Sequence, residues 1–157
     1  MPIAAFLSWI QATRIATTIG DSTLLTGFIS GMHLLGMTLL VGAALVSSLR
    51  MAGIILTDRP LSEVTPGPRR GMIVGLVISV VSGLLLFAPR STAAAENSFF
   101  QIKMLLLCAA ALFHFAVYRG ISGRTDAESS VVKVTGGVGL ILWCGVAVAG
   151  CGYILFE

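Results

Sequence analysis

The stretch LLTGFISGMHLLGMTLLVGAALVSSLR, residues 24–50, decides the fold class of this chain. Its apolar part, residues 24–49, is long enough to cross the roughly 30 Å hydrocarbon core of a bilayer as a helix. Three more stretches share this character, at about 71–88, 102–119 and 134–156. The sequence therefore predicts an all-α integral membrane protein, a single domain over residues 1–157 whose four spans form an up-down bundle.

The composition of the whole chain agrees with this prediction. Hydrophobic residues make up 56% of the chain and charged residues 11%, and the mean hydropathy is +0.97. Soluble domains carry about 25% charged residues, so the composition excludes a soluble enzyme and also a disordered chain. No run of basic residues suggests a nucleic-acid partner.

Residues 2–19 differ from the four spans, because they mix aromatic and aliphatic side chains with polar ones. Phe6, Trp9 and Ile10 are spaced as on one side of a helix, but the segment is too polar to cross a bilayer. We therefore expect an amphipathic helix lying in the membrane interface, with Trp9 at the level of the headgroups.

The basic residues predict how the chain is oriented. One side of the membrane would carry seven of them, Arg50, Arg59, Arg69, Arg70, Arg119, Arg124 and Lys133. The other side would carry three, Arg14, Arg90 and Lys103. Cytoplasmic loops are enriched in lysine and arginine, so both termini are expected outside the cytoplasm.

The chain has two histidines, His33 and His114, and both lie inside predicted spans. An ionisable side chain at membrane depth indicates a functional site, because burying it must be offset by a partner. At 1.5 Å per residue, His33 lies roughly 14 Å and His114 roughly 18 Å into its predicted span. The first and third spans run in the same direction, so we expect the two imidazoles at about the same level.

Two imidazoles at one level on diagonal helices predict a haem site. In an up-down bundle the first and third helices stand diagonally across the core, where one haem b could be held between His33 and His114 as axial ligands of the iron. The walls of the site would be small, and Lys103 could reach a haem propionate. The further residues expected to contact the haem are Gly36, Ser79, Ala110, Ala111 and Lys103.

Rows of small residues on the second and fourth spans suggest where the ring edge would pass. Gly75, Ser79 and Gly83 recur every four residues, and Gly137, Cys144 and Cys151 recur every seven. Such rows are also typical of close helix packing. The three cysteines, including Cys108, are interpreted as small core residues.

Other interpretations of the histidines stay open. A copper or other metal site would use His33 with Met32 and Met37, and a transport path would add Cys144 and Cys151. Proton handling is a further alternative, and so are structural histidines in a subunit without its own cofactor. The chain has no CxxCH, HxxxH or HExxH pattern, so covalent haem attachment and zinc hydrolysis are not indicated.

Six segments in order also carry a family resemblance. They are LSWIQAT at 7–13, HLLG at 33–36, LVGAAL at 40–45 followed by LR, SGLLLF at 82–87, FQIKMLLL at 100–107 and LWCGVAVAGCGYILF at 142–156. The chain resembles, over nearly its whole length, a family of uncharacterised bacterial inner-membrane proteins with four spans. The resemblance matches His33 to a histidine of the family's first span. It leaves the second ligand open, because family members carry a histidine near the position of Tyr118 rather than at His114.

The layout is also similar to that of small b-type membrane cytochromes. We therefore expect a haem b protein of the bacterial inner membrane that transfers single electrons, with a quinone or a cytochrome as partner. Short loops leave little room for a soluble catalytic part, which favours a subunit of a larger complex or a homo-oligomer over a stand-alone enzyme.

Overall fold

The computed structural model describes residues 2–121 and 130–155, and within them the secondary structure is helical. The short helices are α1 (Pro2–Gln11), α2 (Arg14–Asp21), α4 (Leu61–Val64), the 3-10 helix η1 (Ala88–Arg90) and α6 (Ser91–Glu96). The long helices are α3 (Thr23–Met51), α5 (Pro66–Phe87), α7 (Ser98–Ile121) and α8 (Ser130–Leu155). The all-α prediction is confirmed for the described residues.

Four segments, each built around one of the long helices, are long and apolar enough to cross a membrane. Each corresponds to one predicted span, although residue 156 of the last span lies outside the described residues. Three helices begin four or five residues earlier than expected, and one of them is α8, which starts at Ser130. Helix α5 starts at Pro66, since proline is tolerated in the first turn of a helix, and α7 starts at Ser98.

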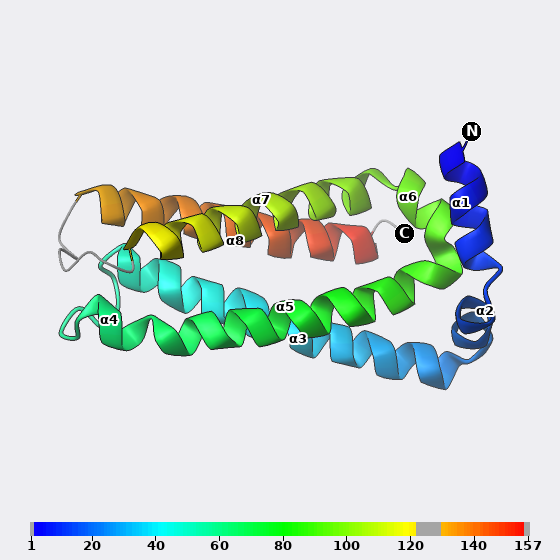
Figure 1. Ribbon diagram of the computed structural model, residues 1–157, viewed down its shortest axis with the longest axis horizontal. Coiled ribbons are helices and arrows are strands. Elements are labelled where there is room, and N and C mark those ends of the chain that lie inside the picture. The colour runs from blue at the N-terminus through cyan, green and yellow to red at the C-terminus, as the bar shows by residue number, and fades with distance from the viewer. Residues whose placement is uncertain (1, 122–129, 156–157) are drawn as a thin grey trace.

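The long helices lie side by side, and successive ones point in opposite directions (Figure 1). Helix α3 packs along both α5 and α8, and α7 packs along α8, whereas neither α3 nor α5 packs extensively against α7. The α3/α5 pair and the α7/α8 pair diverge toward the end that carries α1, α2 and α6, called here the α1 end. The opposite end carries α4 and is called the α4 end.

Helices α3 and α5 approach so closely that only small residues fit between them. A Cβ atom on Gly75 would lie 2.5 Å from the backbone nitrogen of Leu40, and one on Gly36 would lie 2.9 Å from the Ser79 hydroxyl. Helix α8 approaches α3 in the same way, because a Cβ on Gly136 would lie 2.4 Å from the nitrogen of Ala52. These are contacts of the small-residue kind that pack membrane helices.

The apolar core lies where side chains of all four long helices meet. It consists of Leu40 and Ala44 from α3, Met72 from α5, Ala110 from α7, and Trp143 and Val146 from α8. Trp143 is fully buried and is the largest of these side chains. This part of the interior is therefore filled by the protein's own side chains.

The N-terminal segment forms two helices where one was expected. The break falls at Thr13, whose side chain accepts a hydrogen bond from the nitrogen of Ala16 and so caps α2. Helix α1 lies across the α1 end (Figure 1), where the Ser91 hydroxyl donates to the Leu7 carbonyl at 2.8 Å. The side chains of Phe6 and Trp9 are stacked and exposed. The apolar surface predicted from the sequence is present, on a shorter helix.

The interpretation of the cysteines as core residues is wrong. Cys108, Cys144 and Cys151 are all exposed on the outside of the bundle. Helix α8 instead turns Gly136 and Gly139 toward α3. Because α8 is apolar on every side, its sequence does not indicate which side faces inward.

Candidate functional site

His33 lies half-buried on α3, and α5 holds its ring in one orientation. Its Nδ1 atom is 3.0 Å from the hydroxyl oxygen of Ser82. That hydroxyl donates its hydrogen to the carbonyl of Ile78 at 2.6 Å, so it accepts a hydrogen bond from Nδ1–H of His33. The backbone of Ser79 also interacts electrostatically with the ring. The lone pair of the imidazole therefore lies on Nε2.

Gly83 leaves room for the ring of His33. A Cβ atom at this position would lie 3.2 Å from the ring carbon Cε1, tighter than ordinary contact. The row of small residues on α5 thus has two uses, because Gly75 and Ser79 contact the α3 backbone while Gly83 faces the imidazole. Ser82 is not among the residues predicted from the sequence, although its position as a polar residue next to this row could have identified it.

Lys103 brings a positive charge into the same half of the bundle. Its Nζ atom lies 3.9 Å from the position that a Cβ on Gly150 would occupy, and it interacts electrostatically with His33 and Cys151. None of the seven acidic residues of the chain lies on α3, α5, α7 or α8. Among the described residues Lys103 has no ion pair. The ammonium group is thus partly buried without a carboxylate partner.

His114 lies at a different level from His33. It is buried, and its ring meets the Trp143 ring edge-to-face with centroids 6.2 Å apart. Trp143 belongs to the same buried cluster as Leu40 and Ala44. These two residues follow His33 by seven and eleven positions, which is roughly 10–16 Å along a helix. The expected match in depth between the two histidines is therefore wrong.

The mismatch has a simple origin in where the helices begin. His33 lies ten residues after the start of α3 at Thr23, whereas His114 lies sixteen residues after the start of α7 at Ser98. The apolar stretch used to place the third span began at residue 102, so it omitted the first turn of α7. Hydrophobicity marks the part of a helix that can lie in lipid, and the start of the helix depends on capping and packing as well.

The other predicted haem contacts are distributed between two regions. Gly36 and Ser79 touch each other in the α3–α5 contact. Ala110 is buried in the apolar core, and Ala111 beside it is half-buried. Among them, Lys103 and the backbone of Ser79 interact with His33. A haem between His33 and His114 does not fit this arrangement, since Trp143, Leu40 and Met72 fill the interior beside His114.

A metal cluster finds no support in the described residues. They contain no group of three or more histidine, cysteine, aspartate or glutamate side chains that could hold an ion. Cys144 and Cys151, expected along a transport path, are exposed. The side chain of Tyr118, the other candidate for second ligand, lies outside the described part of the structure.

An apolar groove of about 480 Å³ lies between α7 and α8, with Leu106 and Gly145 among its lining residues. It has no histidine or charged side chain in its lining. The groove therefore offers mainly apolar contact, and Cys151 is the one lining side chain that could ligate a metal.

The fold and the site together define a class of helical proteins suited to a membrane. One half of the bundle holds both an imidazole in a fixed orientation and an ammonium group that has no ion-pair partner among the described residues. A family model described as a family of unknown function (DUF6644) matches residues 5–157. Because the match covers nearly the whole chain, the protein belongs to this family. No curated protein and no solved structure matches it.

Proposed function

We propose that the protein is a membrane-embedded b-type haem protein of the bacterial inner membrane, an up-down bundle in which His33 supplies one axial ligand. The observation that carries this proposal is the hydrogen bond from Nδ1 of His33 to Ser82, which leaves Nε2 with the lone pair. Histidines that bind metals typically have their second nitrogen fixed by such a partner. When bound, the haem would supply one-electron redox chemistry.

Lys103 supports the same location. A partly buried ammonium group without a counter-ion is unfavourable in a membrane bundle, and a haem propionate would neutralise it. The interior beside Trp143 is filled by buried side chains, which also favours the half that contains His33 and Lys103.

The redox role that follows is electron transfer within a larger complex or a homo-oligomer. Short helices and turns connect the long helices in the described residues, and no soluble catalytic part is present among them. An electron donor or acceptor, such as a quinol or another cytochrome, would approach within the membrane or at the α1 end. Helix α1 would lie in the outer interface, with Trp9 among the headgroups.

The test is an absorption spectrum of protein purified from haem-replete cells. We expect a Soret band in the wild type and its loss in His33→Ala, because Nε2 of His33 is the ligand. His114→Ala is the matched control and should keep the band, although removing the ring packed on Trp143 should lower thermal stability. A colourless wild-type preparation would contradict the proposal, as would a folded His114→Ala variant that loses haem as completely as His33→Ala.

One observation favours a second candidate, a structural subunit without its own cofactor. The α3–α5 contact is tightly packed and the interior near His114 is filled, as expected when histidines serve helix packing. Wild-type protein that stays folded and colourless after incubation with haemin, with His33→Ala equally stable as part of its parent complex, would favour this candidate.

A further inference from the structure

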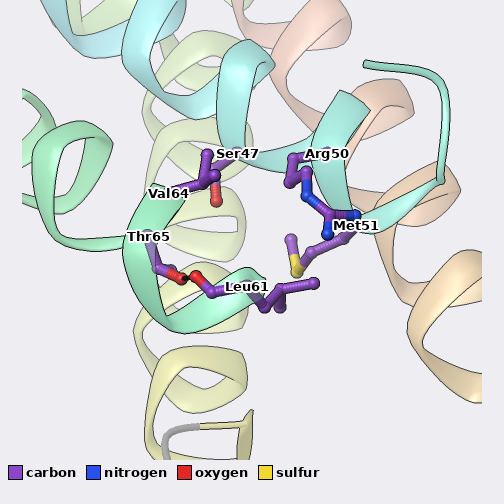
Figure 2. A pocket seen from close by; sticks show the side chains of 6 residues that line it. All are labelled: Ser47, Arg50, Met51, Leu61, Val64 and Thr65. Atoms are coloured by element: carbon purple, nitrogen blue, oxygen red, sulfur yellow. Dashed lines mark hydrogen bonds between the residues drawn. The ribbon is translucent and has the colours of Figure 1, made fainter. Parts of the chain in front are cut away.

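A small pocket lies at the α4 end, far from His33, and a buried arginine forms part of its lining. It lies between the last turn of α3 and the segment joining α4 to α5, and Figure 2 shows its six lining side chains. Arg50 and Met51 lie on one side of the pocket, with Val64 and Thr65 on the other (Figure 2). Ser47 and Leu61 complete the lining.

The guanidinium group of Arg50 is the unusual member of this pocket. The residue is only 6% exposed, and its Nη2 donates to the carbonyl of Arg59. Its Nε–H group has no hydrogen-bond partner among the described residues. A buried donor that carries charge and lacks an acceptor is costly. The C-terminal end of α3 offsets part of this cost through its dipole, but it provides no acceptor for Nε–H.

A second positive feature faces the same pocket. Thr65, which lines it, is the N-cap of the 22-residue helix α5 and makes no side-chain capping bond. The N-terminus of a helix carries a partial positive charge and favours anions. Pro66 and Pro68 have no N–H group, so Gly67 supplies the backbone donor among the first three residues of α5. The nearest acidic residues in sequence, Asp58 and Glu63, are exposed, and neither forms an ion pair with Arg50 among the described residues.

The size of the pocket limits what it can hold. Its volume is about 10 Å³, which is about the volume required by a single water-sized particle. A chloride ion is somewhat larger than a water molecule and would require the lining to shift, and a phosphate or carboxylate group is larger still. Met51 gives the lining some freedom, because methionine side chains adapt their shape readily.

We propose that this pocket is a binding site for one small monovalent anion, of which chloride is the common example. The anion would accept a hydrogen bond from Nε–H of Arg50 and lie at the N-terminus of α5, so that it joins the end of α3 to the start of α5. Its role would be to stabilise the turn between these two helices. The site is independent of haem, since it involves neither His33 nor Lys103.

The test measures chloride binding to the purified protein in detergent at constant ionic strength, with gluconate as the replacement anion because it is too large for the pocket. We expect the thermal midpoint of unfolding to rise saturably with chloride, as ligand binding to the native state requires. The ³⁵Cl resonance of the wild type should also broaden in a saturable way. This second measurement needs no variant and so does not depend on whether a variant folds.

Two variants distinguish the pocket from the basic surface around it. Arg50→Gln should lose both chloride effects, whereas Arg69→Gln, which removes an exposed arginine from the first turn of α5, should retain them. Equal behaviour of chloride and gluconate in the wild type would overturn the proposal and indicate a water in the pocket. Chloride effects that persist in Arg50→Gln and vanish in Arg69→Gln would overturn it as well.

Discussion

The hydrogen bond between His33 and Ser82 controls which nitrogen of the imidazole is available. Ser82 can accept from Nδ1–H because its own hydrogen is given to Ile78. If the ring turned or changed tautomer, Nε2 would carry the proton and could not ligate a metal. The orientation of the Ser82 hydroxyl therefore decides whether Nε2 of His33 can ligate a metal or can only donate a hydrogen bond.

We predict that Ser82→Ala weakens haem binding by about 10-fold to 100-fold, the usual effect of losing a partner that orients a ligand. A titration with haemin followed at the Soret band measures this. Ser79→Ala is the matched control, because Ser79 is equally buried one turn away and its hydroxyl has no partner in the described structure. The control should bind haem as the wild type does. Identical affinity in Ser82→Ala would show that the hydroxyl does not orient the ligand.

The residues of the site differ in how far the sequence alone could identify them. His33 and Lys103 are conspicuous because ionisable side chains are rare in apolar stretches. Ser82 is not conspicuous, since serine is common where membrane helices pack. His33 contacts Ser82 and not His114 because of how α3 and α5 are positioned relative to each other along their axes. The sequence of one helix alone does not determine this relative position.

At the scale of the elements, the contact between α3 and α5 depends on glycine. The Cβ positions of Gly36 and Gly75 fall within 3 Å of atoms on the facing helix, several of them backbone atoms that cannot move aside. Gly42 is on the same helix as Gly36, yet nothing lies within 4 Å of its Cβ position. The two glycines of α3 thus have the same local conformation and different surroundings.

We predict that Gly36→Ala destabilises the protein by about 1 to 3 kcal/mol, the usual cost of overpacking. Gly42→Ala should be close to neutral, because its added methyl group meets no neighbour. Unfolding by a denaturing detergent, followed by circular dichroism, would compare the two variants with the wild type. Equal stability of the two would mean that α3 and α5 are less closely packed than described.

The elements were the best-predicted part of the molecule. Four spans could be located because the length of an apolar stretch is a local property. The starts of α5 at Pro66 and α7 at Ser98 could not, because both lie in polar or proline-containing sequence outside the apolar stretches. Those few residues change where each helix begins along the bundle axis. For this reason the prediction that the two histidines lie at the same level failed.

For the whole molecule, the unequal distribution of basic residues predicts the orientation in the membrane. Of the seven assigned to one side, Arg50, Arg59, Arg69, Arg70 and Lys133 lie at the α4 end, as does the backbone of Arg119 in the last turn of α7, and Arg124 is outside the described residues. The α1 end carries Arg14, Arg90 and Lys103. From the positive-inside rule we predict that the α4 end is cytoplasmic.

We therefore predict that a reporter fused to the C-terminus is active when it requires the periplasm and inactive when it requires the cytoplasm. A fusion within the segment between α7 and α8 should give the opposite pattern and serves as the control. Activity of the C-terminal fusion in the cytoplasm alone would reverse the assignment, and with it the location proposed for α1.

The unequal packing of the long helices has a consequence for how the chain assembles. Contacts between α3 and α5 are the most extensive in the described structure, while α7 reaches the rest mainly through α8. Each pair is also contiguous in sequence, so each forms an antiparallel hairpin that can close by itself after insertion into the bilayer. During synthesis the first hairpin emerges and closes before the second exists. The docking of the two hairpins along α3 and α8 is then the final step, and Gly136, where α8 meets the backbone of α3, is the position at which a bulky residue would leave both hairpins inserted but apart.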